Sequence, residues 1–229
     1  MVAVARREGA WGTAQRLVKY ARLALGFPTQ ETRDYYAWRD AEAQAFDSEL
    51  GLDTGGTVHV FDLTVASPNV AHAGPYIAAG PEHFASAMAL LDVDVAGSTF
   101  VDLGSGKGRA LMLAAEWPFA AITGVEFAAE LHDVCLANIA RFGDARISNV
   151  LGDAEQFAWP PGDLVVFMNN PFDRPLVQRV VARLTADLRA NPRRARVVYL
   201  NPAAPDLFVA AGWRVVADEG SRVVFALDG

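Results

Sequence analysis

The sequence has little of what disulfides, metal sites and membrane spans require. It contains one cysteine, Cys135, so no internal disulfide can form. Its four histidines show neither an H-x-x-x-H pattern nor any other paired-ligand spacing, so no metal dependence is expected. No apolar run is long enough to span a bilayer, and the N-terminus lacks the apolar core and cleavage site of a signal peptide. These absences predict a cytoplasmic protein without membrane contact.

Charge and composition further narrow the class of protein to which the chain can belong. The chain is 52% hydrophobic and 21% charged, which is typical of a folded domain rather than a disordered one. A formal net charge of −7 disfavours nucleic acid as a partner. Arginines gather near the end, and Arg179, Arg183 and Arg193 are predicted to share a helix face. We interpret that stripe as a solvated surface.

The most informative segment is 100–109, FVDLGSGKGR, where an apolar strand pattern ends in a glycine-rich turn. Glycine permits positive φ and close approach of a ligand, and here it recurs at every second position. A dinucleotide site needs G-x-G-x-x-G, but the third glycine comes one residue early and Asp102 precedes the first. A phosphate-binding P-loop needs glycine where Val101 stands and Ser or Thr where Gly108 stands. An ammonium or sulfonium group suits this carboxylate better than a pyrophosphate does.

The D-x-G-x-G-x-G pattern resembles the first motif of class I S-adenosylmethionine (SAM) dependent methyltransferases. Two further acids follow in the order of that family: Glu126 ends a predicted strand at 120–126, and Asp153 follows one at 146–151. The resemblance implies SAM as the cofactor, with Glu126 binding the ribose hydroxyls and Asp153 the adenine amino group. The other cofactor contacts that it implies are Tyr76, Asp102, Gly104, Ser105, Gly106, Gly108 and Asn169.

A fourth motif lies at 163–172, DLVVFMNNPF, where Pro171 must end a buried strand. It resembles the (Asn/Asp)-Pro-Pro-(Phe/Tyr) signature of methyltransferases that act on planar nitrogens, with Asn170 in place of the first proline. The paired asparagines are also similar to a segment of the Dot1-like histone lysine methyltransferases. The resemblance implies that Asn169 and Phe172 are the catalytic residues. The alternative that both asparagines only cap a strand end and a helix stays open.

Tyr76 lies in a segment, 74–84, that resembles the lid of many similar bacterial proteins. The resemblance implies that Tyr76 either donates to the SAM carboxylate or borders the acceptor pocket. A packed aromatic is the alternative. His83, nearby, is expected to be a surface residue.

Strands and helices alternate along the chain, which predicts an α/β fold with helices on both faces of a parallel sheet. Two final strands, at 213–217 and 222–227, are predicted to form a hairpin and add an antiparallel edge. This arrangement resembles the seven-stranded, mostly parallel, doubly wound sheet of the class I methyltransferases. Residues 1–80 are expected to be a helical N-terminal cap with the substrate-recognition segment, including helices at 11–25 and 32–46. Residues 81–229 are expected to be the SAM-binding core.

These observations predict a SAM-dependent methyltransferase whose acceptor is a nitrogen rather than an oxygen, on a protein side chain or a small metabolite. Two alternatives stay open: an NAD-dependent oxidoreductase, and a SAM-binding regulator without catalysis. The sequence does not identify the acceptor or the oligomeric state.

Overall fold

The computed structural model describes residue 41 and residues 44–229, apart from the Phe61 side chain. The chain divides into two compact units, Met1–Glu42 and Ala43–Gly229, and the description below concerns the second. The helix expected at 11–25, most of the one expected at 32–46, and the first half of the expected cap therefore lie outside the described residues. Residues 44–50 are helical, so the second expected helix, which was predicted to end at 46, continues to residue 50.

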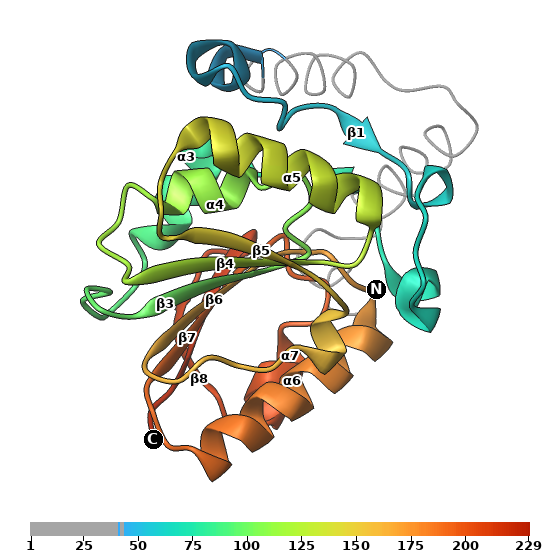
Figure 1. Cartoon of the computed structure of the whole chain (residues 1–229). Coiled ribbons are helices and arrows are strands. Elements are labelled where there is room, and N and C mark those ends of the chain that lie inside the picture. Colours follow the sequence, from blue (N-terminus) through green and yellow to red (C-terminus); the bar gives the residue numbers. More distant parts are fainter. Residues whose placement is uncertain (1–40, 42–43) are drawn as a thin grey trace, which may run out of the picture. The chain divides into compact units, whose positions relative to one another are not determined.

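A seven-stranded sheet forms the centre of this unit, in the order β5-β4-β3-β6-β7-β9-β8 (Figure 1). Strands β3 to β7 are parallel to one another, and β9 is antiparallel to both of its neighbours, β7 and β8. The predicted fold class is confirmed. The strands are β3 (Thr99–Leu103), β4 (Ala121–Glu126), β5 (Ile147–Leu151), β6 (Leu164–Asn169), β7 (Ala195–Leu200), β8 (Arg214–Asp218) and β9 (Arg222–Leu227).

Helices cover both faces of the sheet, as expected: α3, α4 and α5 lie on one side, and α6 and α7 on the other (Figure 1). Their bounds are α3 (Pro81–Met88), α4 (Arg109–Ala114), α5 (Ala129–Phe142), α6 (Arg174–Ala190) and α7 (Asp206–Ala210). Since both faces are buried, the central strands are mostly apolar, and every residue of β7 is buried, including Arg196. Two hydrophobic clusters, one built with α6 and the other with α3 and α4, form the core.

Short elements precede α3 and follow β5. Strands β1 (Thr57–Val58) and β2 (Tyr76–Ile77) pair antiparallel in a sheet of their own. Single-turn helices η1 (Val60–Asp62) and η2 (Pro68–His72) lie between them, and η3 (Ala154–Gln156) follows β5. Apart from η3, these elements lie within residues 1–80, the segment expected to form the cap.

The sheet order places the ligand site. Strand β3 pairs with β4 on one side and with β6 on the other, so the winding direction reverses between β3 and β6. Ligands of open α/β sheets bind beyond the carboxyl ends of the strands at such a reversal. The glycine turn after β3 and the Asn-Asn-Pro segment after β6 both begin there.

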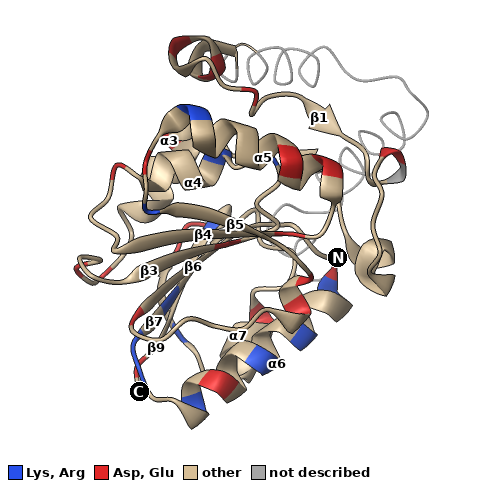
Figure 2. Cartoon of the chain, in the orientation of Figure 1, with Lys and Arg blue, Asp and Glu red and all other residues tan. Residues whose placement is uncertain are grey.

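The predicted arginine stripe is wrong, because α6 ends at Ala190 and Arg193 lies beyond it. Arg179 pairs with Glu155 at 3.0 Å, and Arg193 pairs at 2.6 Å with Asp187, the one acidic residue within α6; Figure 2 shows the charged positions of this helix in blue and red. Arg196 is buried in β7 between Asp92, at 2.6 Å, and Asp228, at 2.7 Å. These arginines bind carboxylates of this chain rather than forming a free basic surface.

Among the described helices, none has the length and apolar character that crossing a membrane requires.

Candidate cofactor and acceptor site

The glycine turn between β3 and α4 depends on the absence of side chains. Gly104, Gly106 and Gly108 have φ of 76°, 54° and 90°, in the left-handed region that favours glycine. The backbone N–H groups of Gly104 and Ser105 both donate to the Val125 carbonyl, at 2.9 and 3.1 Å, which fixes the turn to β4. A Cβ on Gly106 would overlap the ring of Tyr76. The turn therefore has a fixed shape and a surface that an aromatic ring already contacts.

We expect Gly106→Ala to lower the free energy of unfolding by more than Gly97→Ala does. Both glycines have positive φ, 54° and 79°, where a Cβ costs about 1–2 kcal/mol. At Gly97 nothing lies within 4 Å of the added Cβ, whereas at Gly106 the Tyr76 ring must also move. Urea denaturation of both variants measures the difference. Equal losses would show that the contact with Tyr76 is released without cost.

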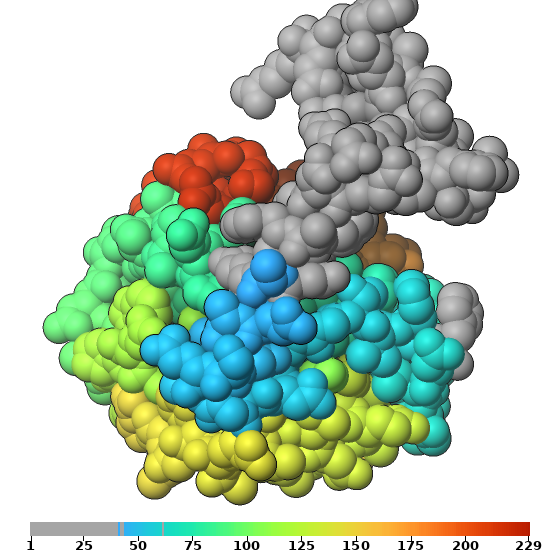
Figure 3. Space-filling model, turned by 90° about the horizontal axis from the view of Figure 1, so that it is seen from above, coloured from blue at the N-terminus to red at the C-terminus, as the bar shows by residue number. Residues whose placement is uncertain are grey.

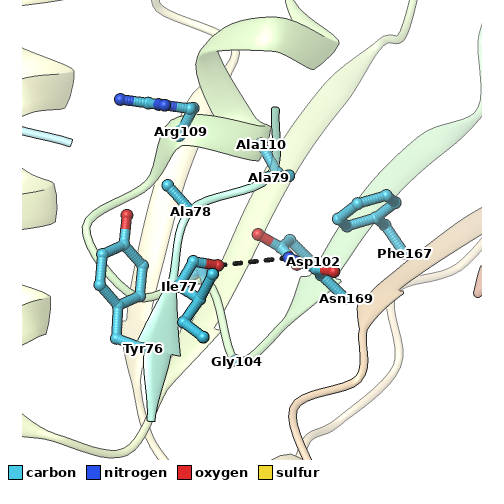
Figure 4. A pocket seen from close by; sticks show the side chains of 11 residues that line it. Tyr76, Ile77, Ala78, Ala79, Asp102, Gly104, Arg109, Ala110, Phe167 and Asn169 are labelled. Carbon is cyan, nitrogen blue, oxygen red and sulfur yellow. Dashed lines mark hydrogen bonds between the residues drawn. The ribbon is translucent and has the colours of Figure 1, made fainter. Parts of the chain in front are cut away.

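A pocket opens beside this turn, between the β2 segment and the ends of β3 and β6 (Figure 4). Five of the predicted site residues line it: Tyr76, Asp102, Gly104, Ser105 and Asn169. Arg109 and Phe167, which the sequence analysis did not select, line it as well. Residues more than 90 positions apart thus meet at one place.

Asp102 is the ionisable group of the pocket with the most unusual environment. Its side chain is 3% exposed and accepts no hydrogen bond from any residue that the structure describes. Burial, with a smaller contribution from the charge of Glu126, raises the pKa of Asp102 to about 8. A cationic ligand beside this buried carboxyl group would stabilise its ionised form.

Glu126, at the end of β4, supports the glycine turn from behind. Its Oε2 accepts from the Gly106 N–H at 2.8 Å and its Oε1 from the Ala128 N–H at 2.9 Å. Burial raises the pKa of Glu126, although these backbone hydrogen bonds oppose the shift. Each carboxylate oxygen retains a further lone pair for a ligand hydroxyl. Glu126 touches the turn but is not part of the pocket lining, and its ribose contact stays a prediction.

Asp153 and Phe172 lie away from this pocket. Asp153 caps η3 through the Glu155 N–H at 2.8 Å, and it also accepts from the Ser67 hydroxyl and, at 2.8 Å, from the Asn69 amide. Phe172 is 8% exposed and belongs to the core cluster on the α6 side. The adenine contact of Asp153 and the substrate contact of Phe172 are not tested by this arrangement and stay predictions.

Tyr76 joins the pocket to the segment before β1. Its hydroxyl donates to the Thr54 carbonyl at 2.6 Å, and Arg109 Nε donates to Thr54 Oγ1 at 2.7 Å. Thr54 in turn donates to Asp47, at 2.5 Å. Burial raises the pKa of Tyr76, so its hydroxyl keeps the proton at neutral pH. Residues 44–75, blue to cyan in Figure 3, form part of the surface seen in that view.

Asn169, the last residue of β6, holds the other wall. Its Nδ2 donates to the Ile77 carbonyl at 3.2 Å, the dashed line in Figure 4, and its Oδ1 accepts from Asn201 Nδ2 at 3.1 Å. Asn170 is exposed and has φ of 47°. The sequence signal for Asn201 was a second Asn-Pro pair after a buried strand, which the sequence analysis did not use.

His83 lies in α3, outside the pocket lining, where burial and then the charge of Arg222 lower its pKa. Within the described part of the chain, no three His, Cys, Asp or Glu side chains come together as metal ligands.

No protein-family model and no curated protein matches the sequence. Solved structures similar to this one include a TehB-like SAM-dependent methyltransferase from Corynebacterium glutamicum, at 14% identity, covering 62% of this chain and 85% of that one, with a TM-score of 0.45. Another is the ribosomal protein L11 methylase of Lactobacillus delbrueckii. It is 14% identical, the match covers 64% of this chain and 79% of that one, and the TM-score is 0.48. A third is the magnesium protoporphyrin IX methyltransferase of Synechocystis with bound S-adenosylhomocysteine (SAH). It is 11% identical, the match covers 65% of this chain and 83% of that one, and the TM-score is 0.48. The likeness to these methyltransferases is one of fold, and the seven-stranded, mostly parallel sheet is the fold class that the sequence predicted.

Proposed function

We propose that this protein is a SAM-dependent methyltransferase that methylates a nitrogen atom. The observation that carries the proposal is the Asp102 carboxyl group, buried beside a glycine turn and facing a pocket. Gly104, in that turn, lines the pocket without a side chain. SAM carries a sulfonium and an ammonium group, so a buried carboxylate fits it and repels the pyrophosphate of a dinucleotide.

In this proposal the chain's residues bind and orient rather than react. The cofactor contacts are Asp102, Gly104, Ser105, Gly106, Gly108, Glu126 and Asp153, with Tyr76 and Asn169 at the reacting end. SAM supplies a methyl group on a good leaving group, so the protein mainly has to align the acceptor and exclude water. The buried Phe167 ring contributes an apolar wall to the pocket.

The nitrogen preference rests on the side chains available at the pocket. An oxygen acceptor would need a base, but Tyr76 keeps its proton, Arg109 is a cation and Asp102 is assigned to the cofactor. A nitrogen acceptor needs an oxygen that accepts its N–H and stabilises the developing positive charge, which Asn169 Oδ1 can do. The acceptor is a protein side chain or a small metabolite.

Calorimetric titration of the purified protein with SAM, SAH and NAD tests the cofactor, and methyl transfer from tritiated SAM to cell extract tests the reaction. We expect SAM and SAH to bind more tightly than NAD, and labelled product to appear. Tighter binding of NAD would favour the oxidoreductase alternative. Binding of SAM without labelled product in any extract fraction would favour the regulator.

A further inference from the structure

The side-chain amide of Asn169 has only one orientation that satisfies both of its neighbours. The Ile77 carbonyl can only accept, so the group that faces it at 3.2 Å must be Nδ2. Oδ1 is then directed toward Asn201, whose Nδ2 donates to it at 3.1 Å. A flipped Asn169 would place its carbonyl oxygen against that of Ile77. The Ile77 carbonyl thus fixes which atom of Asn169 accepts hydrogen bonds, and the Asn201 amide, as it is oriented, holds that oxygen in place.

The position of Asn201 follows from a sequence pattern, a strand followed by Asn-Pro, that occurs twice in the chain. Strands β6 and β7 are parallel neighbours, with Asn169 paired in register with Leu200. Each strand is followed by an Asn-Pro step, and Asn170 and Asn201 both have φ of 47°. Proline cannot continue a central ladder, so both strands end at the same level of the sheet. Asn201 thereby comes directly after the residue that lies beside Asn169.

The backbone of Asn201 is also anchored. Its N–H donates to the Ser221 carbonyl at 2.7 Å, which ties it to the turn between β8 and β9. Its side chain is nevertheless exposed, so a hydrogen bond to Asn169 replaces one to water and stabilises the fold little. The effect of this contact is on the orientation of Asn169 rather than on folding.

We propose that Asn201 is a positioning residue for methyl transfer, which holds Asn169 Oδ1 as the hydrogen-bond acceptor at the point where the methyl group leaves sulfur. This inference rests on the proposed function. It also describes the acceptor side: the oxygen offered to the substrate N–H is neutral, because it belongs to one of two hydrogen-bonded carboxamides. Asn201 does not itself touch the transferred methyl group.

A pair of SAM analogues tests this without a known acceptor. Sinefungin carries an amine on carbon in place of the methylsulfonium group, whereas SAH has nothing there. An oxygen at the methyl position therefore favours sinefungin, and the ratio of the SAH Kd to the sinefungin Kd measures that preference. We expect Asn169→Ala to lower the ratio by about tenfold or more, and Asn201→Gly by about three- to tenfold. Glycine is chosen because it accepts a φ of 47° without strain.

Asn170→Gly is the matched control. Asn170 has the same φ, also precedes proline and is exposed, and its side chain makes no hydrogen bond to any described residue. Its variant should keep the wild-type ratio. In the double variant Asn169→Ala with Asn201→Gly, the ratio should equal that of Asn169→Ala alone, because Asn201 acts through Asn169.

Three results would overturn the inference: a wild-type ratio near one, an unchanged ratio in Asn201→Gly, or a ratio that falls as much in Asn170→Gly. Failure of the wild-type protein to bind either analogue would refute the proposed function instead.

Discussion

Replacing Asp102 by asparagine is expected to stabilise the free protein while weakening its binding of SAM. The raised pKa, about 8, means that the folded protein holds the Asp102 proton where the unfolded chain, with a pKa near about 4, has released it. Raising the pH between these values therefore favours the unfolded state of the wild type. Asparagine has no proton to release. The variant's advantage should grow by at most about 1.4 kcal/mol per pH unit from pH 4 to pH 8.

Urea denaturation of both proteins at several pH values measures this difference. Asp144→Asn is a control of opposite sign, because hydrogen bonds from Arg146 hold the pKa of Asp144 below its usual range. That carboxylate contributes stability that is present above the unfolded pKa and is lost at low pH. Stability curves that run parallel for the wild type and Asp102→Asn would contradict the raised pKa.

The expected loss of SAM affinity in Asp102→Asn also depends on pH. Only the ionised carboxylate attracts a cation, so the ratio of wild-type to Asp102→Asn affinity for SAM should rise from pH 6 to pH 8 and then level off. Above pH 8 we expect the variant to bind about tenfold more weakly or worse, the scale of a hydrogen bond to a charged group. The titration of SAM itself changes both affinities by the same factor, so it cancels in their ratio. Calorimetry provides the affinities, and a flat ratio near one would exclude contact between Asp102 and the cofactor.

Asn169→Ala is expected to lower methyl transfer by about 10²-fold or more while leaving SAM affinity nearly unchanged, as removal of one preorganised polar group from a transition state does. The reason is positional. Asn169 ends β6 at the carboxyl edge of the sheet and lines the pocket, and Asn201 directs its Oδ1. Transfer of tritiated methyl from SAM to the acceptor fraction of cell extract measures the rate, and calorimetry with SAM measures binding.

Asn170→Ala serves as the comparison, since Asn170 is exposed, follows the last residue of β6 and is not part of the pocket lining. It should lower the rate less than Asn169→Ala. A larger loss in Asn170→Ala would shift the acceptor role by one residue. Full activity in both variants would exclude the planar-nitrogen interpretation and favour an oxygen or carbon acceptor.

The sequence predicted the strands of the main sheet to within a residue or two because their boundaries depend on local chemistry. Pro171 had to end β6, and the strand ends at Asn169. The spacing of glycines between 104 and 108 predicted a turn into a helix, and α4 begins at Arg109. Apolar runs bounded by such residues predicted buried parallel strands, which is what a sheet covered on both faces requires.

Contacts between distant segments could not be predicted in the same way. The hydrogen bond between Asn169 and Asn201 depends on the register of β6 with β7, and that between Asp153 and Asn69 on the path of η2. The sequence gives no spacing that relates either pair. The prediction that Arg193 shares a helix face failed because sequence spacing was applied too far. The spacing suited a helix, but Asn191 and Pro192 separate Arg193 from α6. Helical periodicity holds only as far as the helix continues.

The direction of β9 decides where the protein can be attached to a surface without obstructing its pocket. Because β9 runs antiparallel to β7, Leu227 lies beside Ala195, where the parallel strands begin, whereas the pocket lies where they end. A strand of this length, six residues, spans roughly 20 Å. A tether at Gly229 therefore leaves the binding edge facing away from the support, and the Arg196–Asp228 ion pair keeps the attachment point close to the sheet.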